Sequence, residues 1–159
     1  MVSSTRNVVH YTSVKQRILN ALLNPAWVCF LWAGMTMGIS MLAVPTLFTA
    51  GSIARPVVLD VARVVFTALN KAEVVALIAL LITIRVGGRA RNWWGFGAVL
   101  TLIVIAQGVW LIPELSARTD MIIAGGTPPP SMAHAIYSTL ELVKVGLLLF
   151  VGWKTLSAP

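Results

Sequence analysis

The sequence has few charged residues and very few acidic ones. Only 11% of its 159 residues are charged and five are acidic, whereas soluble globular chains are about one quarter charged. Hydrophobic residues make up 58% of the chain, which excludes a disordered protein and a water-soluble enzyme. The 12 Lys and Arg residues give a net charge of +7, which in a polar protein would suggest nucleic acid. This composition is instead that of an integral membrane protein, so we expect a lipid bilayer as partner and no nucleic acid.

Cysteine and histidine are equally scarce. Cys29 is the single cysteine, which excludes a disulfide framework and a thiolate metal cluster. The two histidines cannot form a bis-histidine haem site, because His10 precedes the apolar part of the chain. Met35, Met37 and Met41 are soft ligands of the kind that Cu(I) prefers, but only two share a helix face, which favours apolar packing. No nucleotide-binding loop, zinc-protease motif or serine-hydrolase motif occurs, so we predict neither a cofactor nor an enzyme.

Long apolar runs dominate the chain. A membrane-spanning helix needs about 20 mostly apolar residues. Four segments meet this requirement, residues 27–50, 57–84, 93–112 and 131–156, and Ser131 is the predicted N-cap of the last. Helical spacing in the third continues past Pro113 towards Ala124. The short connections leave no room for a soluble domain, so we predict an all-α polytopic membrane protein, with a four-helix bundle at residues 25–156.

Basic residues near the ends of the spans are unequally distributed. Seven lie on the side that holds both termini: Arg6, Lys15, Arg17, Arg85, Arg89, Arg91 and Lys154. Three lie on the opposite side: Arg55, Arg63 and Arg118. Because basic flanks are retained in the cytoplasm, both termini are predicted to be cytoplasmic, in a multi-pass protein of a bacterial cytoplasmic (inner) membrane.

The N-terminal segment and several tryptophans mark the predicted cytoplasmic boundary. Residues 1–24 lack the features of a cleavable signal peptide, and their apolar residues lie near one face of a helix. This pattern predicts an interfacial helix on the inner leaflet, and a continuation of the first span is the alternative. Five tryptophans lie near the predicted cytoplasmic ends, as in an interfacial belt: Trp27, Trp32, Trp93, Trp94 and Trp153.

Four charged residues lie near the middle of the predicted spans, where an unpaired charge costs about 2.5–3.5 kcal/mol. They are Lys71, Glu73, Glu141 and Lys144, and their formal charges sum to zero. Glu73 and Lys144 reach about the same depth on helix faces that can meet. We therefore predict that they form a buried pair, or that Glu73 and Glu141 share a proton. Lys71 points nearly opposite to Glu73, so it lies outside this arrangement.

Further polar side chains lie at helical spacing between the mid-membrane charges and the outer surface, and form a polar stripe on one face of each helix. The fourth span carries His134, Tyr137, Glu141 and Lys144, the second carries Arg63, Thr67, Asn70 and Glu73, and the third carries Gln107, Glu114 and Arg118. The functional hypothesis is an outward-opening polar cavity or relay, with the Glu73–Lys144 pair at its base and His134, Glu114 and Arg118 at its mouth. The alternative is a hydrogen-bonded network that fixes helix register and transports nothing.

Gly34 and Gly38 form a G-x-x-x-G motif in the first span. Small residues at this spacing allow two helix backbones to approach closely. We expect an intrachain helix contact at this motif rather than a dimer.

Three short motifs resemble a known family. The first span carries W-A-G-M-T-M at 32–37 followed by Leu47-Phe48, the third carries W-L-I-P-E at 110–114 followed by Arg118-Thr119, and the fourth carries H-A-I-Y-S-T at 134–139. In order and spacing, from Trp32 to Gly152, the chain resembles the small four-helix membrane proteins typified by transmembrane protein 205. The resemblance implies the four-helix topology and no particular biochemical activity. Lys71, Glu73, Glu141 and Lys144 are not part of the family's pattern, so the resemblance implies no role for them.

Two classes of function compete. The first is a small carrier or channel-like protein whose polar stripe binds a proton, an ion or a small polar solute. The second is a non-catalytic membrane subunit in a larger complex or a homo-oligomer, and Lys71, which faces away from the stripe, favours it. A lipid-modifying enzyme would have to draw all its catalytic groups from His134 and Glu114, so this class ranks third.

Overall fold

The computed structural model describes residues 24–87 and 91–157, and the regular structure within these ranges is helical. Within these ranges, four stretches are long and apolar enough to cross a membrane: Pro25–Leu47, Arg55–Val86, Trp93–Ile123 and Ala133–Leu156. The predicted all-α architecture with four spans is therefore confirmed, and the third span continues past Pro113 as its spacing indicates. The interfacial helix predicted within residues 1–24 lies outside the described residues, apart from Asn24.

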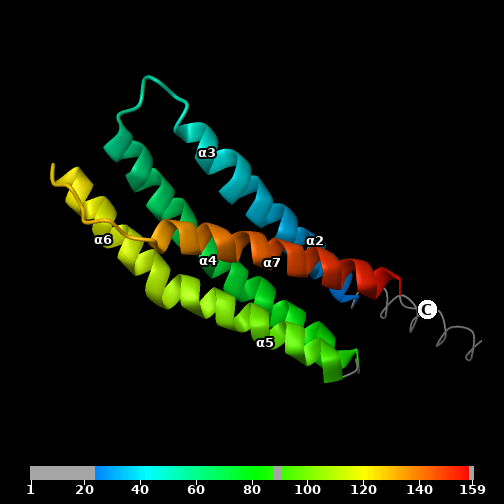
Figure 1. Ribbon diagram of the computed structural model, residues 1–159. Coiled ribbons are helices and arrows are strands. Elements are labelled where there is room, and N and C mark those ends of the chain that lie inside the picture. Colours follow the sequence, from blue (N-terminus) through cyan, green and yellow to red (C-terminus); the bar gives the residue numbers. More distant parts are fainter. Residues whose placement is uncertain (1–23, 88–90, 158–159) are drawn as a thin grey trace, which may run out of the picture.

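Two of the four spans contain a π-helical segment. The first span consists of α2 (Pro25–Thr36), η1 (Met37–Ala43) and α3 (Val44–Leu47). The third consists of α5 (Arg91–Ile105), η2 (Ala106–Leu111) and α6 (Ile112–Ile123). The second and fourth spans are the continuous helices α4 (Arg55–Val86) and α7 (Ala133–Leu156), and Figure 1 shows how the spans follow one another.

Each π-helical segment ends two residues before a proline, Pro45 in the first span and Pro113 in the third. A proline inside a helix lacks a backbone donor, and its ring clashes with the carbonyl four residues earlier. A wider turn just before the proline is a local adjustment that lets a membrane helix continue. The two prolines are therefore the sequence signal for these segments.

Local sequence also explains where two of the helices begin. The Asn24 side chain accepts a hydrogen bond from a backbone N–H of the first turn of α2, and Pro25 occupies a position where its missing N–H costs little. The predicted N-cap of α7, Ser131, is wrong by one residue, because Met132 occupies that position. Ser131 Oγ still accepts a hydrogen bond from the Ala133 N–H at 3.1 Å, so it satisfies one of the orphan donors.

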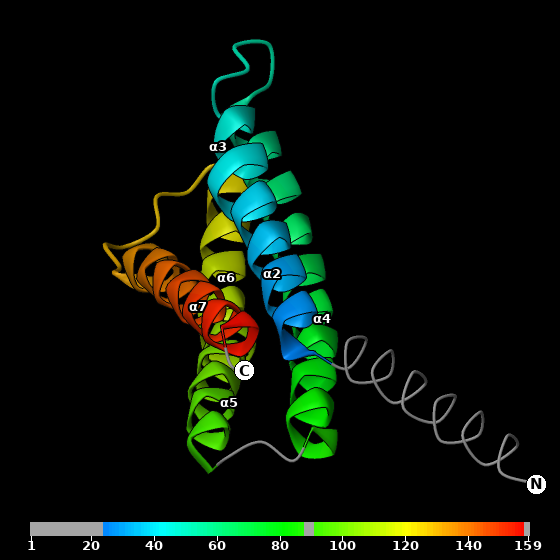
Figure 2. The same cartoon turned by 90° about the vertical axis from the view of Figure 1, so that its right-hand side faces the viewer.

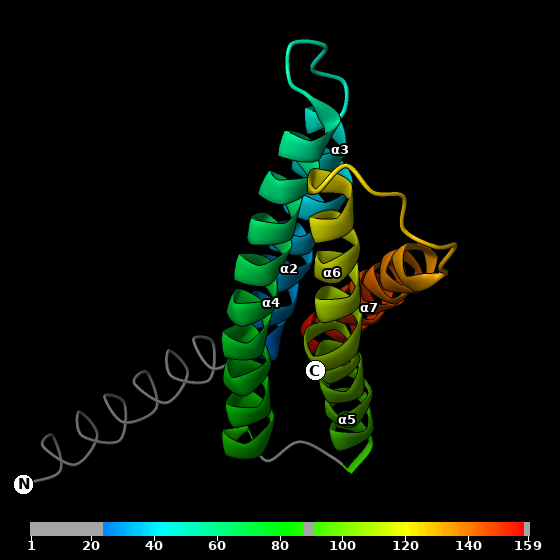
Figure 3. The ribbon, with the colours of Figure 1, turned by 90° about the vertical axis from the view of Figure 1, so that its left-hand side faces the viewer.

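The main buried core lies in the half of the bundle where α7 packs along α2. Its buried members are Cys29, Trp32, Ala33, Leu77, Leu80, Ile84, Leu100, Val104, Leu148 and Val151. Gly152 permits this packing, since a Cβ there would lie 3.0 Å from the Phe30 ring. In the other half the N-terminal end of α7 leans away from the remaining helices (Figures 2 and 3), and a smaller cluster around Leu111 and Tyr137 is buried.

Gly34 and Gly38 do not make the helix contact that their spacing predicts. A Cβ at either position would meet nothing within 4 Å, so this prediction is wrong for the described part of the chain. The reason is that Thr36, midway between them, faces the centre of the bundle and turns the two glycines outward. The close approach is made instead at Gly108 in η2, where a Cβ would lie 2.5 Å from Oδ1 of Asn70 on α4.

Replacing Gly108 by alanine should lower the free energy of unfolding by about 1–3 kcal/mol. The added methyl group would displace the Asn70 side chain, which donates a hydrogen bond to the Val104 carbonyl at 3.3 Å. Gly34→Ala is the matched control and should be neutral or slightly stabilising, because its Cβ has open space and alanine is the better helix former. Thermal unfolding in detergent, followed by circular dichroism, measures both; equal effects would contradict the contact.

Candidate functional site

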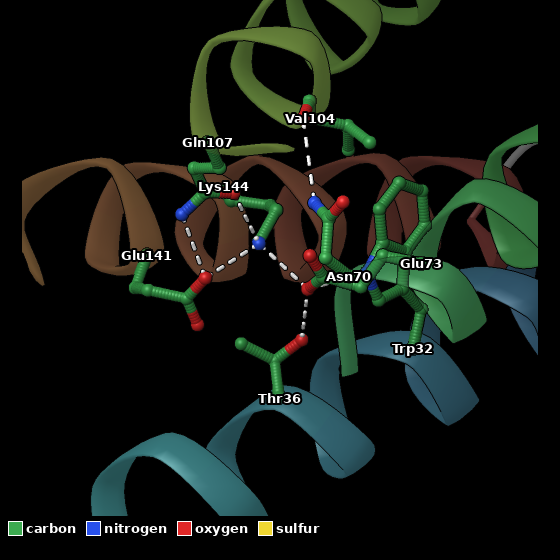
Figure 4. Close-up of polar contacts among 8 residues, drawn as sticks. All are labelled: Trp32, Thr36, Asn70, Glu73, Val104, Gln107, Glu141 and Lys144. Atoms are coloured by element: carbon green, nitrogen blue, oxygen red, sulfur yellow. Dashed lines mark hydrogen bonds and ion pairs between the residues drawn. The ribbon is translucent and has the colours of Figure 1, made fainter. Parts of the chain in front are cut away.

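One lysine holds two carboxylates at the centre of the bundle. Lys144 Nζ on α7 lies 2.6 Å from Oε1 of Glu73 on α4 and 2.6 Å from Oε1 of Glu141, one turn earlier on α7. It also donates a hydrogen bond to Oε1 of Gln107 in η2, at 2.8 Å. All four side chains are buried, and Figure 4 shows Nζ between them. The predicted Glu73–Lys144 pair is present, and Glu141 joins it as a second acidic group.

Glu73 connects the first span to this network. Trp32 Nε1 and Thr36 Oγ1 both donate to its Oε1, at 3.1 and 2.9 Å. Trp32 is 1% exposed, so its prediction as a belt residue is wrong; its indole N–H is buried because Glu73 offers an acceptor. Trp27 and Trp153 are 66% and 68% exposed, as belt residues should be. Sequence periodicity missed both donors, because an isolated tryptophan or threonine in an apolar span gives no sign of its partner.

Gln107 connects the third span to the network. Its Nε2 donates to Oε1 of Glu141 at 2.8 Å, while its Oε1 accepts from Lys144. Asn70, which the stripe of the second span also predicts as a site residue, donates to the Val104 carbonyl instead and so ties α4 to the third span. Gln107 lies in one π-helical segment and Thr36 directly precedes the other. Such segments are frequent at functional sites, and here all four spans meet at the network.

The network is short of one positive charge. Two carboxyl groups contact a single lysine, so one net negative charge remains when all three groups are ionised. A buried charge without a partner is costly, so uptake of a proton or another cation would stabilise this arrangement. Oε2 of Glu73 and Oε2 of Glu141 make no hydrogen bond of normal geometry with the described residues, which leaves one oxygen of each carboxyl group available.

A cavity of about 700 Å³ lies in the half of the bundle where α7 leans away. Its walls are mainly apolar and come from the first, second, third and fourth spans. Arginines and a histidine line it towards the α3–α4 connection: Arg55, Arg63, Arg118 and His134. Tyr137 and Glu141, which are both buried, also line the cavity, so it extends to one residue of the buried network.

Three buried polar atoms along this cavity make no hydrogen bond of normal geometry with the described residues, although the Tyr137 hydroxyl lies close enough to the Glu141 carboxyl group to interact with it. They are Ser40 Oγ, Tyr137 OH and Glu141 Oε2. Leaving a buried polar atom without a hydrogen bond costs about 1–3 kcal/mol. A polar ligand that formed hydrogen bonds with these atoms would therefore bind favourably. The edge of the Tyr137 ring is held by Phe66, whose centroid lies 5.3 Å away in a T-shaped arrangement.

The residues predicted at the mouth of the cavity are brought together in part. His134 and Arg118 line it, and Arg118 also donates to the Pro129 carbonyl. Glu114 is not among the lining residues; its Oε1 accepts a hydrogen bond from Ser131 Oγ at 2.6 Å. No hydrogen bond joins His134 to Glu114 within residues 24–87 and 91–157, so the pair that a lipid-modifying enzyme would use is not formed there.

Comparisons of the chain with family models, with curated proteins and with solved structures find no match. No relative therefore assigns a role to the network. What this site can do has to be inferred from its cavity, its charges and its unused polar atoms.

Proposed function

We propose that the protein is a small membrane carrier or channel-like protein, and that its cavity delivers a proton to Glu141. The observation that supports this best is a cavity lined by a buried glutamate, Glu141, whose Oε2 makes no hydrogen bond of normal geometry with the described residues. Other ions and small polar solutes belong to the same proposal as a wider class. The proton is favoured among cations because it supplies the missing positive charge, while the described residues contain no group of three or more His, Cys, Asp or Glu side chains that could hold a metal ion.

Glu141 is the group that exchanges with the cavity in this proposal, because it lines the cavity while Glu73 does not. Lys144 keeps Glu73 as a partner when Glu141 takes up a proton, so the helices stay tied together in both states. Gln107 holds the Oε1 atom of Glu141, which leaves Oε2 as the oxygen that binds and releases the proton.

We propose further that both termini are cytoplasmic and that the cavity opens outward from a bacterial inner membrane. The unequal distribution of basic residues supports this orientation. Membership of the transmembrane protein 205 family is likewise a proposal, carried by the three motifs alone.

Proton flux into liposomes tests the proposed function. The purified chain is reconstituted into vesicles that contain a pH-sensitive dye, and a potassium diffusion potential drives protons inwards. We expect the wild type to carry protons and Glu141→Gln to fall to the level of empty vesicles, because removing a positioned proton-transfer group typically costs about a hundredfold or more. Glutamine retains the shape of the side chain, and the Glu73–Lys144 pair remains to hold the fold.

Glu114→Gln is the matched control, since it neutralises a carboxylate outside the cavity and should leave the flux unchanged. A cysteine at exposed Ser52, labelled from outside with a membrane-impermeant maleimide, reports the orientation of the reconstituted chain. Full activity in Glu141→Gln would refute the role of Glu141. A wild type that carried neither protons nor Na⁺ or K⁺ above empty vesicles would refute transport of these ions.

A second function is supported by a separate observation. Lys71 is exposed on α4 at the depth of the buried network, although it lies within a membrane span. A charge in this position favours a second role for the chain, as a subunit of a larger membrane complex.

A further inference from the structure

Lys71 lies at mid-membrane depth on the outside of the bundle. It is two residues before Glu73, whose carboxylate contacts Thr36 of the first span and Lys144 of the fourth. Thr36 and Lys144 lie near the midpoints of their spans. At a rise of about 1.5 Å per residue, Lys71 is displaced from this level by about 3 Å along α4.

The aliphatic stem of Lys71 is too short to carry its ammonium group out of the membrane. Half of the hydrocarbon core measures about 15 Å, which leaves about 12 Å between the Cα level of Lys71 and the nearer headgroups. Residues with intramembrane charges nearly always face a protein interior and pair with an opposite charge. The exposed Lys71 side chain lacks such a partner within the described chain.

Every acidic residue of the chain is engaged elsewhere. The five are Asp60, Glu73, Glu114, Asp120 and Glu141. Glu73 and Glu141 contact Lys144, Asp60 and Asp120 both pair with Arg63, and Glu114 accepts a hydrogen bond from Ser131. Glu73 and Glu141 are buried, and the other three lie about two helical turns or more from the level of the network along their helices. Neither this chain nor an identically folded copy therefore presents a carboxylate beside Lys71.

Lys71 also lies in the middle of a regular seam along α4. The seam consists of eight exposed residues that are alternately four and three positions apart in the sequence: Val57, Val61, Val64, Ala68, Lys71, Val75, Ile78 and Ile82. This is the spacing by which helices pack side by side in left-handed pairs, and one polar residue in such a seam fixes the register of the partner. Ala68, nearly one turn from Lys71, allows a second backbone to approach closely.

We infer that this seam docks a transmembrane helix of a different protein, which carries an Asp or Glu at the middle of its span. The carboxylate of that helix pairs with Lys71, and its apolar residues cover the valines and isoleucines on either side. A second copy of this chain does not fit, because symmetric packing along the seam would bring two Lys71 ammonium groups together. The inference rests on the subunit function above and is independent of the proposed proton transport.

Association of the full chain with synthetic helices in phospholipid vesicles tests this inference. The chain carries a donor fluorophore on Ser52→Cys, and leucine–alanine peptides of about 20 residues carry an acceptor. Three peptides differ only at their central residue, which is Asp, Leu or Lys. We expect the wild type to bind the Asp peptide about tenfold more tightly than the Leu peptide.

The matched variants separate pairing from general helix association. Lys71→Leu should bind the Asp and Leu peptides equally, and Lys71→Glu should bind the Lys peptide most tightly. Lys154→Leu is the control: it removes an exposed lysine at the end of α7 and should behave as the wild type. Unchanged melting temperatures of the variants show that the fold is intact.

Three results would overturn the inference. One is a wild type that binds the Asp and Leu peptides equally, since Lys71 would then contribute nothing to helix association. Another is undiminished Asp selectivity in Lys71→Leu. The third is disulfide formation between two copies of a Val75→Cys variant in the absence of peptide, because the seam would then be a homodimer interface. The vesicles used to measure proton flux contain no second protein, so the two proposals succeed or fail separately.

Discussion

Replacing Lys144 by methionine is expected to lower the free energy of unfolding by about 3–5 kcal/mol, the usual cost of leaving a buried charge without its partner. Methionine fills the same space, so the loss comes from the two carboxyl groups of Glu73 and Glu141 that the ammonium group holds. It also releases the Oε1 acceptor of Gln107. Of the substitutions considered, we expect this one to destabilise the fold most.

Glu73→Gln should cost less than Lys144→Met, because Lys144 then retains Glu141 in a one-to-one pair. The double change Glu73→Gln with Lys144→Met should recover part of the loss, since one buried carboxyl group then remains instead of two. Adding Glu141→Gln removes the last charge and should recover more. A purely apolar or amide-lined core of similar volume is often as stable as a buried ion pair.

Thermal and chemical unfolding in detergent, read by circular dichroism, give these free energies. Lys154→Met is the control, because Lys154 is an exposed lysine in the last turn of the same helix. If the losses of the two single variants simply added in the double variant, the interaction free energy between Glu73 and Lys144 would be zero, and the ion pair would contribute nothing to stability.

Replacing Ser138 by tryptophan is expected to abolish proton flux while leaving the fold stable. Ser138 is exposed on α7 and lines the cavity, so an indole at this position occupies the space in front of Glu141. The substitution touches none of the hydrogen bonds of the buried network. It therefore separates the cavity from the network, which the Glu141→Gln variant cannot do.

Thr139→Trp is the matched control for this prediction. Thr139 is the next residue on α7, it is also exposed, and it is not among the residues that line the cavity. Flux into dye-loaded vesicles should fall to the level of empty vesicles in Ser138→Trp and remain at the wild-type level in Thr139→Trp. Equal flux in the two variants would mean that protons reach Glu141 by another route, or not at all.

The sequence by itself determined the number of spans and the residues that carry charge inside them. Apolar run length decides which segments cross a bilayer, and that quantity is local. The depth of Glu73 and Lys144 also follows from counting residues along each helix, so their pairing could be predicted before the helices were packed. Depth alone left the pairing of Glu141 open, because Glu141 and Lys144 share a face of the same helix.

Only the tertiary structure decided which other side chains join the network and where the cavity lies. Trp32 and Thr36 enter the site because α2 presents that face to α4, and this same rotation turns Gly34 outward. Helical periodicity gives the face of a residue on its own helix but not the direction in which that face points within the bundle. The cavity exists because α7 leans away from the other spans, and such a tilt depends on packing along its whole length, as at Gly152 against Phe30, rather than on any local pattern.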